Sequence, residues 1–164
     1  MQTPNTAQLV AGIQSWIHCE SPSHSPAGVA AMAELVRAYA DAAGLRVEVT
    51  PLGNATGPLL YTTNRAPDDT RPGILILAHL DTVHPIGTLK DNPVRIEGDR
   101  LYGPGSYDMK AGIYLALSAL GQFSVPGSTQ LPVDFLMVPD EETGSHASRE
   151  WIERYAATAK YALV

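Results

Sequence analysis

Hydrophobic residues near the amino terminus recur every three to four positions, and this spacing predicts two amphipathic helices. The first runs from about residue 6 to residue 19, and the second begins at Pro26 with Ser25 as its N-cap. A polar, proline-containing stretch at residues 20–26 separates the two helices. Gly44 is suited to end the second helix, because glycine readily adopts the left-handed conformation.

Further along the chain, short apolar runs alternate with helical patterns. Residues 73–78 are apolar at every position except the initial glycine, as expected of a central strand buried on both faces. Helices are predicted at 109–123 and 145–156, and other strands at 45–49, 59–62, 94–96, 100–102, 133–138 and 161–164. This alternation predicts an α/β three-layer sandwich, in which helices cover both faces of a mostly parallel or mixed central sheet.

The amino-acid composition argues against some kinds of binding partner. The 164 residues carry a formal net charge of −6 without a lysine or arginine cluster, which argues against nucleic acid and anionic membranes as partners. A bound divalent cation would offset part of this charge, although the charge is equally consistent with simple solubility. No apolar run approaches the roughly 18 residues of a membrane span. Cys19 is the single cysteine and is expected to be buried in the first helix. No signal peptide is visible, so a cytoplasmic location is expected.

Acidic residues follow two of the predicted strands. His79 and Asp81 come directly after the strand at 73–78, and residues 140–142, with the sequence DEE, come after the strand at 133–138. Ligands of open α/β sheets bind at the carboxyl ends of the strands, so these side chains are expected to converge there. Asp108, at the start of the intervening helix, would lie on the same rim.

The residue types in this cluster suggest a metal site. His79 and Asp81 are two positions apart and point to the same face of an extended chain. Since a metal-bound imidazole usually donates its other N–H to a carboxylate, His79 is interpreted as a ligand and Asp81 as the group that orients it. Of Glu141 and Glu142, one would bind metal and the other would accept a proton from water. A solvated loop is the alternative for this pair, and a helix N-cap is the alternative for Asp108.

Three segments together resemble a known family. Residues 78–83 (AHLDTV), 103–112 (GPGSYDMKAG) and 140–145 (DEETGS) are similar to motifs of the zinc aminoacylase/carboxypeptidase metallopeptidase family. That family includes glutamate carboxypeptidase, acetylornithine deacetylase and succinyl-diaminopimelate desuccinylase. Residues 20–23 (ESPS) resemble the glutamate carboxypeptidase branch. The resemblance extends over essentially the whole chain and implies a zinc exopeptidase-like fold.

The resemblance also implies a role for each site residue. His79 would bind one zinc ion, Asp108 would bridge two and Glu142 would bind the other, while Glu141 would be the general base and Asp81 would orient His79. The cofactor would be Zn²⁺, two per complete site, with Co²⁺ or Mn²⁺ able to substitute. The reaction would be hydrolysis of an amide bond in a small peptide or an N-acyl amino acid. The Asp108-Met109 bond is a candidate cis peptide.

The same resemblance places residues 1–164 in the N-terminal part of a single catalytic domain. The lid or dimerisation domain, a further acidic ligand and a final histidine would all lie outside these residues, which would impair the activity of this chain by itself. The alternative is a non-catalytic fragment that binds metal weakly or not at all and self-associates through an exposed sheet edge or apolar surface. A calcium module is disfavoured, because no loop has the spacing of calcium ligands.

Overall fold

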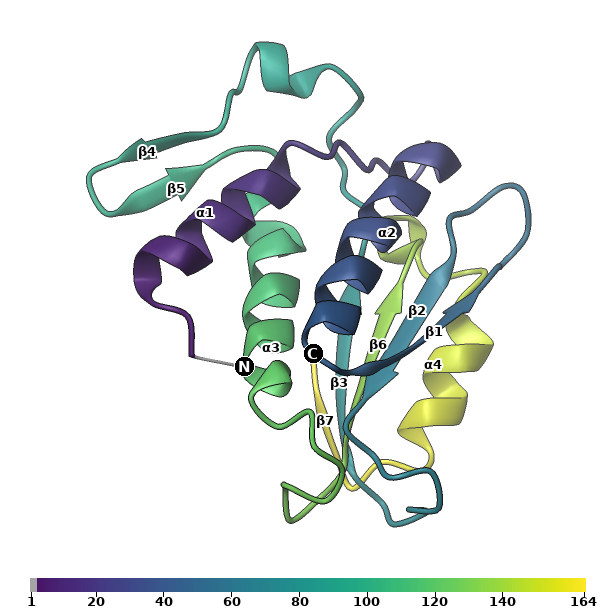
Figure 1. Ribbon diagram of the computed structural model, residues 1–164. Coiled ribbons are helices and arrows are strands. Elements are labelled where there is room, and N and C mark those ends of the chain that lie inside the picture. Colours follow the sequence, from purple (N-terminus) through teal and green to yellow (C-terminus); the bar gives the residue numbers. More distant parts are fainter. Residues whose placement is uncertain (1–2) are drawn as a thin grey trace.

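The core of the molecule is a five-stranded mixed sheet with the strand order β1-β2-β6-β3-β7 (Figure 1). The computed structural model describes residues 3–164. Strand β3 pairs in parallel with β6 and β7, whereas β2 is antiparallel to β1 and to β6. The strands are β1 Arg46–Thr50, β2 Leu59–Thr63, β3 Ile74–His79, β6 Val133–Val138 and β7 Tyr161–Leu163. The predicted mixed sheet is therefore confirmed.

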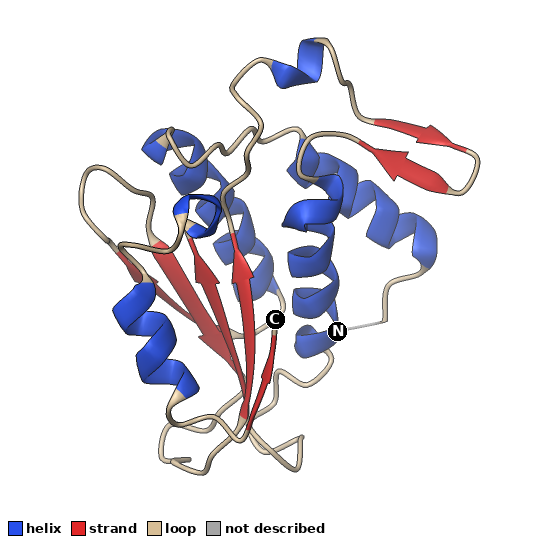
Figure 2. Ribbon diagram, turned by 180° about the vertical axis from the view of Figure 1, so that it is seen from behind, coloured by secondary structure: helices blue, strands red, loops and turns tan. Residues whose placement is uncertain are grey.

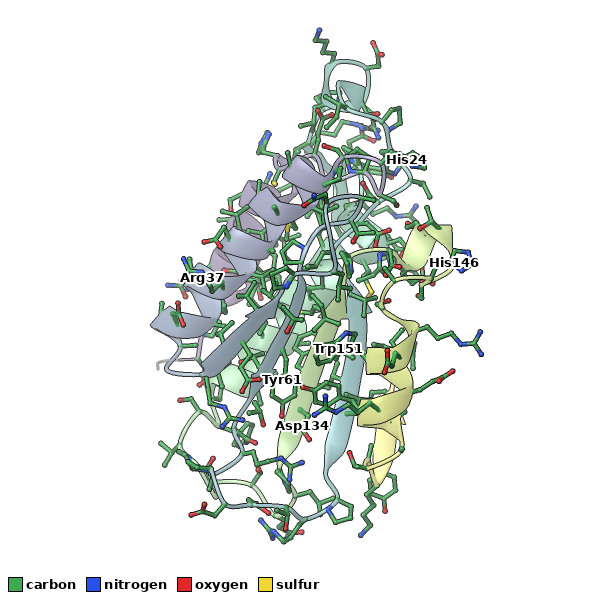
Figure 3. The ribbon with its side chains drawn as sticks, turned by 90° about the vertical axis from the view of Figure 1, so that its right-hand side faces the viewer. His24, Arg37, Tyr61, Asp134, His146 and Trp151 are labelled. Atoms are coloured by element: carbon green, nitrogen blue, oxygen red, sulfur yellow. The ribbon has the colours of Figure 1, made fainter. Side chains whose placement is uncertain are left out.

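Helices cover both faces of this sheet. Three of them lie on one face, namely α1 Thr6–Ile17, α2 Pro26–Ala42 and α3 Ala111–Gly121, whereas α4 Arg149–Ala156 packs on the other (Figures 1 and 2). Each face has its own buried cluster, and Trp151 (labelled in Figure 3) and Tyr155 of α4 pack against the second one. The predicted α/β three-layer arrangement is confirmed.

The first two helices begin where the sequence predicts. Ser25 caps α2 by accepting a hydrogen bond from the N–H of Gly28, and Gly44 follows the helix with φ of 75°. One expectation in this region is wrong. Helix α1 ends at Ile17, so Cys19 lies beyond the helix and is only half-buried.

Two predicted helices are shorter than their apolar patterns suggest. The pattern at 109–123 divides into a distorted π-helical turn, η2 Ser106–Lys110, and the regular helix α3. The pattern at 145–156 gives a helix only from Arg149, after the short 3₁₀ turn η3 Glu141–Thr143. The left-handed conformation of Ser145 (φ 54°) excludes the predicted start at residue 145, because a right-handed helix cannot contain it.

A small hairpin of β4 Arg95–Glu97 and β5 Arg100–Tyr102 extends from the main body near α1 (Figure 1). It follows the 3₁₀ turn η1 Thr88–Lys90 and corresponds to the two predicted short strands. No helix within residues 3–164 combines the length and the apolar character that crossing a membrane requires.

Candidate metal centre

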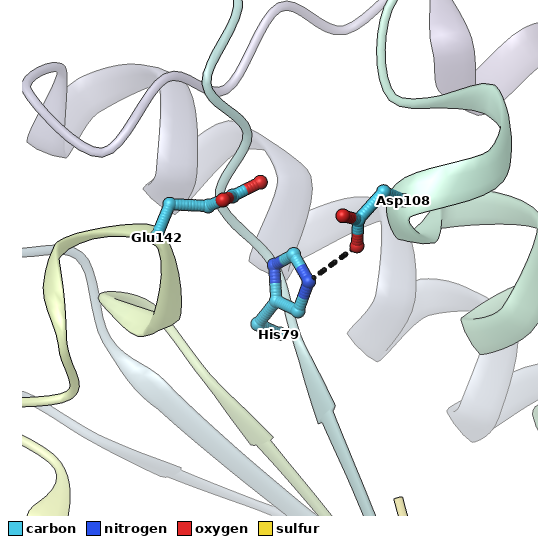
Figure 4. A group of neighbouring side chains, drawn as sticks. All are labelled: His79, Asp108 and Glu142. Atoms are coloured by element: carbon cyan, nitrogen blue, oxygen red, sulfur yellow. Dashed lines mark hydrogen bonds and ion pairs between the residues drawn. The ribbon is translucent and has the colours of Figure 1, made fainter.

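The pairing of two strands brings the predicted site residues together. Strands β3 and β6 are parallel neighbours, and His79 at the end of β3 is in register with Val138 at the end of β6. His79 and the loop at 140–142 therefore leave the sheet at the same edge. Asp108, in the η2 turn, reaches the same place from the opposite side (Figure 4).

Three side chains form the centre of the site. His79 Nε2 lies 2.9 Å from Asp108 Oδ1, and donor atoms of His79, Asp108 and Glu142 all lie within 4.8 Å of one another (Figure 4). The imidazole is buried, whereas the Asp108 side chain is 66% exposed and so remains accessible from the cleft. The structure thus brings together the three residues that the sequence suggests as ligands, although their metal-binding role remains a prediction.

Asp81 contacts the ring nitrogen of His79 that does not face Asp108. Its carboxylate is fully buried and lies 3.4 Å (Oδ1) from Nδ1 of His79, while its main-chain carbonyl is closer, at 3.0 Å. Because a carbonyl oxygen can only accept, Nδ1 carries the proton and Nε2 faces Asp108. The predicted contact between Asp81 and His79 therefore exists, but the main-chain carbonyl of Asp81 makes the shorter bond.

The electrostatics of the site favour a cation. Burial by itself lowers the pKa of His79, but hydrogen bonds with Asp81 and Asp108 outweigh it and raise this pKa to about 9. The pKa of Glu142 is raised by burial and by the neighbouring carboxylates of Asp108 and Glu141. Within the described residues, the buried ammonium group of Lys110 donates to the main-chain oxygen of Cys19 and forms no ion pair with these carboxylates. A position that holds a proton between an imidazole and several carboxylates suits a metal ion equally well.

The two glutamates line different hollows. Glu141 borders a cavity of about 320 Å³ whose apolar wall includes Met109, Val138 and Ile152, and its Oε2 lies 3.9 Å from His79 Nε2. Glu142 borders a second cavity of about 140 Å³ together with Tyr107 and other residues. Asp108 lines both. The Glu141 side chain is 54% exposed, so the solvated-loop interpretation of this pair stays an alternative.

The N-cap alternative for Asp108 is wrong. The backbone of Asp108 is not helical (φ −116°, ψ 99°), and neither η2 nor α3 has a side-chain cap. The Asp108-Met109 peptide bond is cis, as the family resemblance implies. Gly105 has φ of +68°, and a Cβ there would lie 2.7 Å from the side chain of Thr82. Glycine at this position therefore allows the turn to approach the end of β3.

Two residues near the site have roles that sequence reasoning missed. Asp140 belongs to the acidic run but is buried, and its Oδ2 accepts a hydrogen bond of 2.7 Å from the N–H of Ala147. Ser23 donates to Asp81 Oδ2 at 2.6 Å. The only signal for Ser23 was its place in the ESPS motif, because 58 residues separate it from Asp81.

The histidine and acidic cluster thus lies at the carboxyl ends of parallel strands, where open α/β sheets bind their ligands. Residues 75–164 match the model of peptidase family M20/M25/M40, and the chain belongs to this family. It is 40% identical over 93 residues to carboxypeptidase G2 of Pseudomonas sp. (strain RS-16), covering 55% of this chain and 22% of that protein. It is 29% identical over 139 residues to succinyl-diaminopimelate desuccinylase of Gluconobacter oxydans (strain 621H), covering 84% and 35%.

Solved structures have the same fold. Human carnosine dipeptidase 1 superposes with a TM-score of 0.75 at 20% identity, over 95% of this chain and 37% of that one. The M20 family metallo-carboxypeptidase Sso-CP2 from Sulfolobus solfataricus gives 0.69 at 19% identity, over 95% and 36%. The chain thus spans well under half the length of these relatives.

Proposed function

We propose that this chain carries part of the active site of a zinc-dependent hydrolase that cleaves an amide bond in a peptide or an N-acyl amino acid. The family supports a hydrolytic peptidase, and two relatives are named as a carboxypeptidase and a desuccinylase. The observation that carries the proposal is the cluster of His79, Asp108 and Glu142, with Glu141 beside it. Because the chain spans 22% and 35% of those relatives, the whole protein's activity and substrates are part of the proposal.

The donor set fits zinc. One imidazole nitrogen with carboxylate oxygens is a common ligand combination for Zn²⁺, and it suits Co²⁺ and Mn²⁺ as substitutes. His79, Asp108 and Glu142 would hold the metal. Asp108 has two carboxylate oxygens and lines both cavities, so it is the residue that we expect two ions to share. When bound, zinc polarises a carbonyl group and makes water a stronger acid.

The remaining side chains have separate tasks. Glu141 is 54% exposed and lines the larger cavity, where it can accept a proton from water and return it to the leaving amine nitrogen. Asp81 keeps the Nδ1 proton of His79 in place, so that Nε2 remains the atom directed into the site. The apolar wall formed by Met109, Val138 and Ile152 can hold the nonpolar part of a substrate.

Metal content and turnover test this proposal together. The metal-free chain is titrated with zinc, its bound zinc is measured by elemental analysis, and it is assayed on a dipeptide and an N-acyl glutamate. We expect wild-type chain to bind zinc and His79→Ala to lose it, with slow or absent turnover unless a longer form of the protein is used. Zinc bound equally by wild type and His79→Ala would refute the site.

A second candidate function is a non-catalytic fragment that associates with itself. It is supported by the apolar side chains exposed on and after β7, where Tyr161 is 56%, Leu163 57% and Val164 97% exposed. Sedimentation velocity of the metal-free chain separates the candidates. A monomer that binds zinc supports the hydrolase, whereas a concentration-dependent oligomer without bound zinc supports the fragment.

A further inference from the structure

The segment between α1 and α2 lies alongside the chain that leaves β3. Pro22 and Thr82 form a parallel bridge, with the N–H of Thr82 donating to Ser21 O at 2.9 Å and the N–H of Ser23 donating to Thr82 O at 3.3 Å. Residues 19–23, which we call the brace, therefore extend the sheet hydrogen bonding past His79. The brace contains the ESPS motif, to which the proposed function assigns no role.

Side chains fix the brace at several points. The buried hydroxyl of Ser21 donates to Leu80 O at 2.9 Å. The carboxylate of Glu20 accepts hydrogen bonds from the N–H groups of Gly87 (2.7 Å) and Leu89 (3.0 Å).

The η2 turn, which carries Asp108, also holds the brace. The buried ammonium group of Lys110 donates to Cys19 O. Because these contacts reach the segments that carry His79 and Asp108, the brace has little freedom to shift.

Ser23 extends from the brace to Asp81. Its hydroxyl donates to Asp81 Oδ2 at 2.6 Å, the shortest hydrogen bond that this carboxylate receives. The N–H groups of Glu141 and Glu142 donate to Oδ1 and Oδ2 of the same carboxylate, each at 3.2 Å, and His79 Nδ1 lies 3.4 Å away. One fully buried carboxylate thus connects the brace, the imidazole and the backbone of both glutamates.

We propose that Ser23 is a positioning residue for the metal centre. Its hydroxyl fixes the rotation of the Asp81 carboxylate. That carboxylate holds the backbone at Glu141 and Glu142 and adds to the main-chain bond that orients the His79 ring. A buried carboxylate that loses its strongest donor turns toward its remaining partners, which displaces the groups bonded to it. The inference rests on the proposed function in so far as these groups serve a metal.

Ser25 provides a matched control in the same loop. Its hydroxyl accepts a hydrogen bond from the N–H of Gly28 at 3.1 Å and caps α2, but it forms no hydrogen bond with Asp81. Ser25→Ala removes one hydroxyl and weakens a helix, so it reports the effect of a merely structural serine. Ser23→Thr keeps a hydroxyl at the position under test.

The experiment compares Ser23→Ala, Ser23→Thr and Ser25→Ala in the full 164-residue chain. Amide hydrogen exchange is followed by NMR in metal-free protein at Glu141 and Glu142, with the amide of Phe135 in β6 as the reference for global opening. We expect Ser23→Ala to speed exchange at the two glutamates about 10-fold relative to Phe135. Ser23→Thr should stay near wild type, and Ser25→Ala should leave the ratio unchanged.

Zinc affinity, measured by competition with a chromophoric chelator, is the second readout. We expect Ser23→Ala to weaken zinc binding about 10-fold, the lower end for groups that orient a ligand, and Ser25→Ala to have no such effect. Two results would overturn the proposal. In the first, Ser23→Ala shows the same exchange ratio of the two glutamates to Phe135 as the wild type. In the second, Ser23→Ala exchanges faster but binds zinc as tightly as the wild type. Should wild-type chain bind no zinc, the proposed function fails, whereas the exchange ratio still decides whether Ser23 holds Asp81 and the glutamate loop.

Discussion

The Nε2 atom of His79 lies 2.9 Å from Oδ1 of Asp108, although the two residues are 29 positions apart in the sequence. His79 ends a buried strand, and Asp108 sits in a turn whose backbone is not helical. The imidazole of His79 and the carboxylate of Asp108 are thus held within hydrogen-bonding distance, and both line the same cavity. This relationship underlies the first prediction.

Zinc should stabilise the folded chain, and His79 should be required for the effect. A ligand that binds only the folded state adds about 2.7 kcal/mol to the free energy of unfolding at a concentration 100 times its Kd. We expect added zinc to raise the Tm of wild-type chain and a chelator to reverse this. The Tm of His79→Ala should not respond to zinc, and differential scanning calorimetry measures both. An equal response in both proteins would contradict the assignment.

Glu141 and Glu142 should separate metal binding from turnover. We expect Glu141→Gln to keep zinc and to lose at least about 100-fold in hydrolysis, because a general base contributes roughly that factor or more. Glu142→Gln should instead lose zinc, because its carboxylate belongs to the donor cluster. Turnover is measured in whichever form of the protein is active, and zinc by elemental analysis. The reverse pattern would mean that the two roles are exchanged.

Gly105 should tolerate alanine less well than another left-handed glycine. Gly105→Ala strains the left-handed backbone and also places its Cβ 2.7 Å from the Thr82 side chain. Gly98 has a similar φ of +63°, but a Cβ there would have nothing within 4 Å. Gly98→Ala is therefore destabilised only by the backbone strain, by roughly 1 kcal/mol. We expect Gly105→Ala to lose about 3 kcal/mol in urea unfolding. Equal losses would show that the close approach is unimportant.

Asp134 should make the stability of the fold depend on acid. Burial raises the pKa of its carboxyl group, but hydrogen bonds from Arg65, Tyr61 and Thr63 outweigh this and lower the pKa below its ordinary value (Figure 3). A lowered folded-state pKa adds stability that is complete above the unfolded pKa of about 3.9 and is lost as the pH falls through the folded value.

The corresponding test is Asp134→Asn. We expect a loss of about 3 kcal/mol at pH 7, because the mostly buried Arg65 loses its charged partner. The difference from wild type should shrink as the pH falls below about 3.9, which urea unfolding at pH 7 and pH 3 measures. Asp41→Asn, which breaks an exposed pair with Arg37, should change stability by less than about 0.5 kcal/mol at either pH. A difference that does not depend on pH would contradict this reasoning.

The sequence by itself determined the elements and the layers. Apolar periodicity is a local property, so it located β3 and β6 nearly to the residue, and local capping groups such as Ser25 located the start of α2. The same locality explains the errors at residues 109 and 145. There the backbone is left-handed or non-helical, a conformation that the apolar pattern favouring helix does not reveal.

Only the tertiary structure decided how the site is assembled. The sequence placed His79, Asp81, Asp108, Glu141 and Glu142 near one edge, because parallel strands end together. It could not show that Glu141 and Glu142 line different cavities, that Asp140 is a buried loop anchor, or that Ser23 donates to Asp81. These facts depend on side-chain directions and on packing between segments far apart in the chain, such as Ser23 and Asp81 at a separation of 58 residues, which no local pattern encodes.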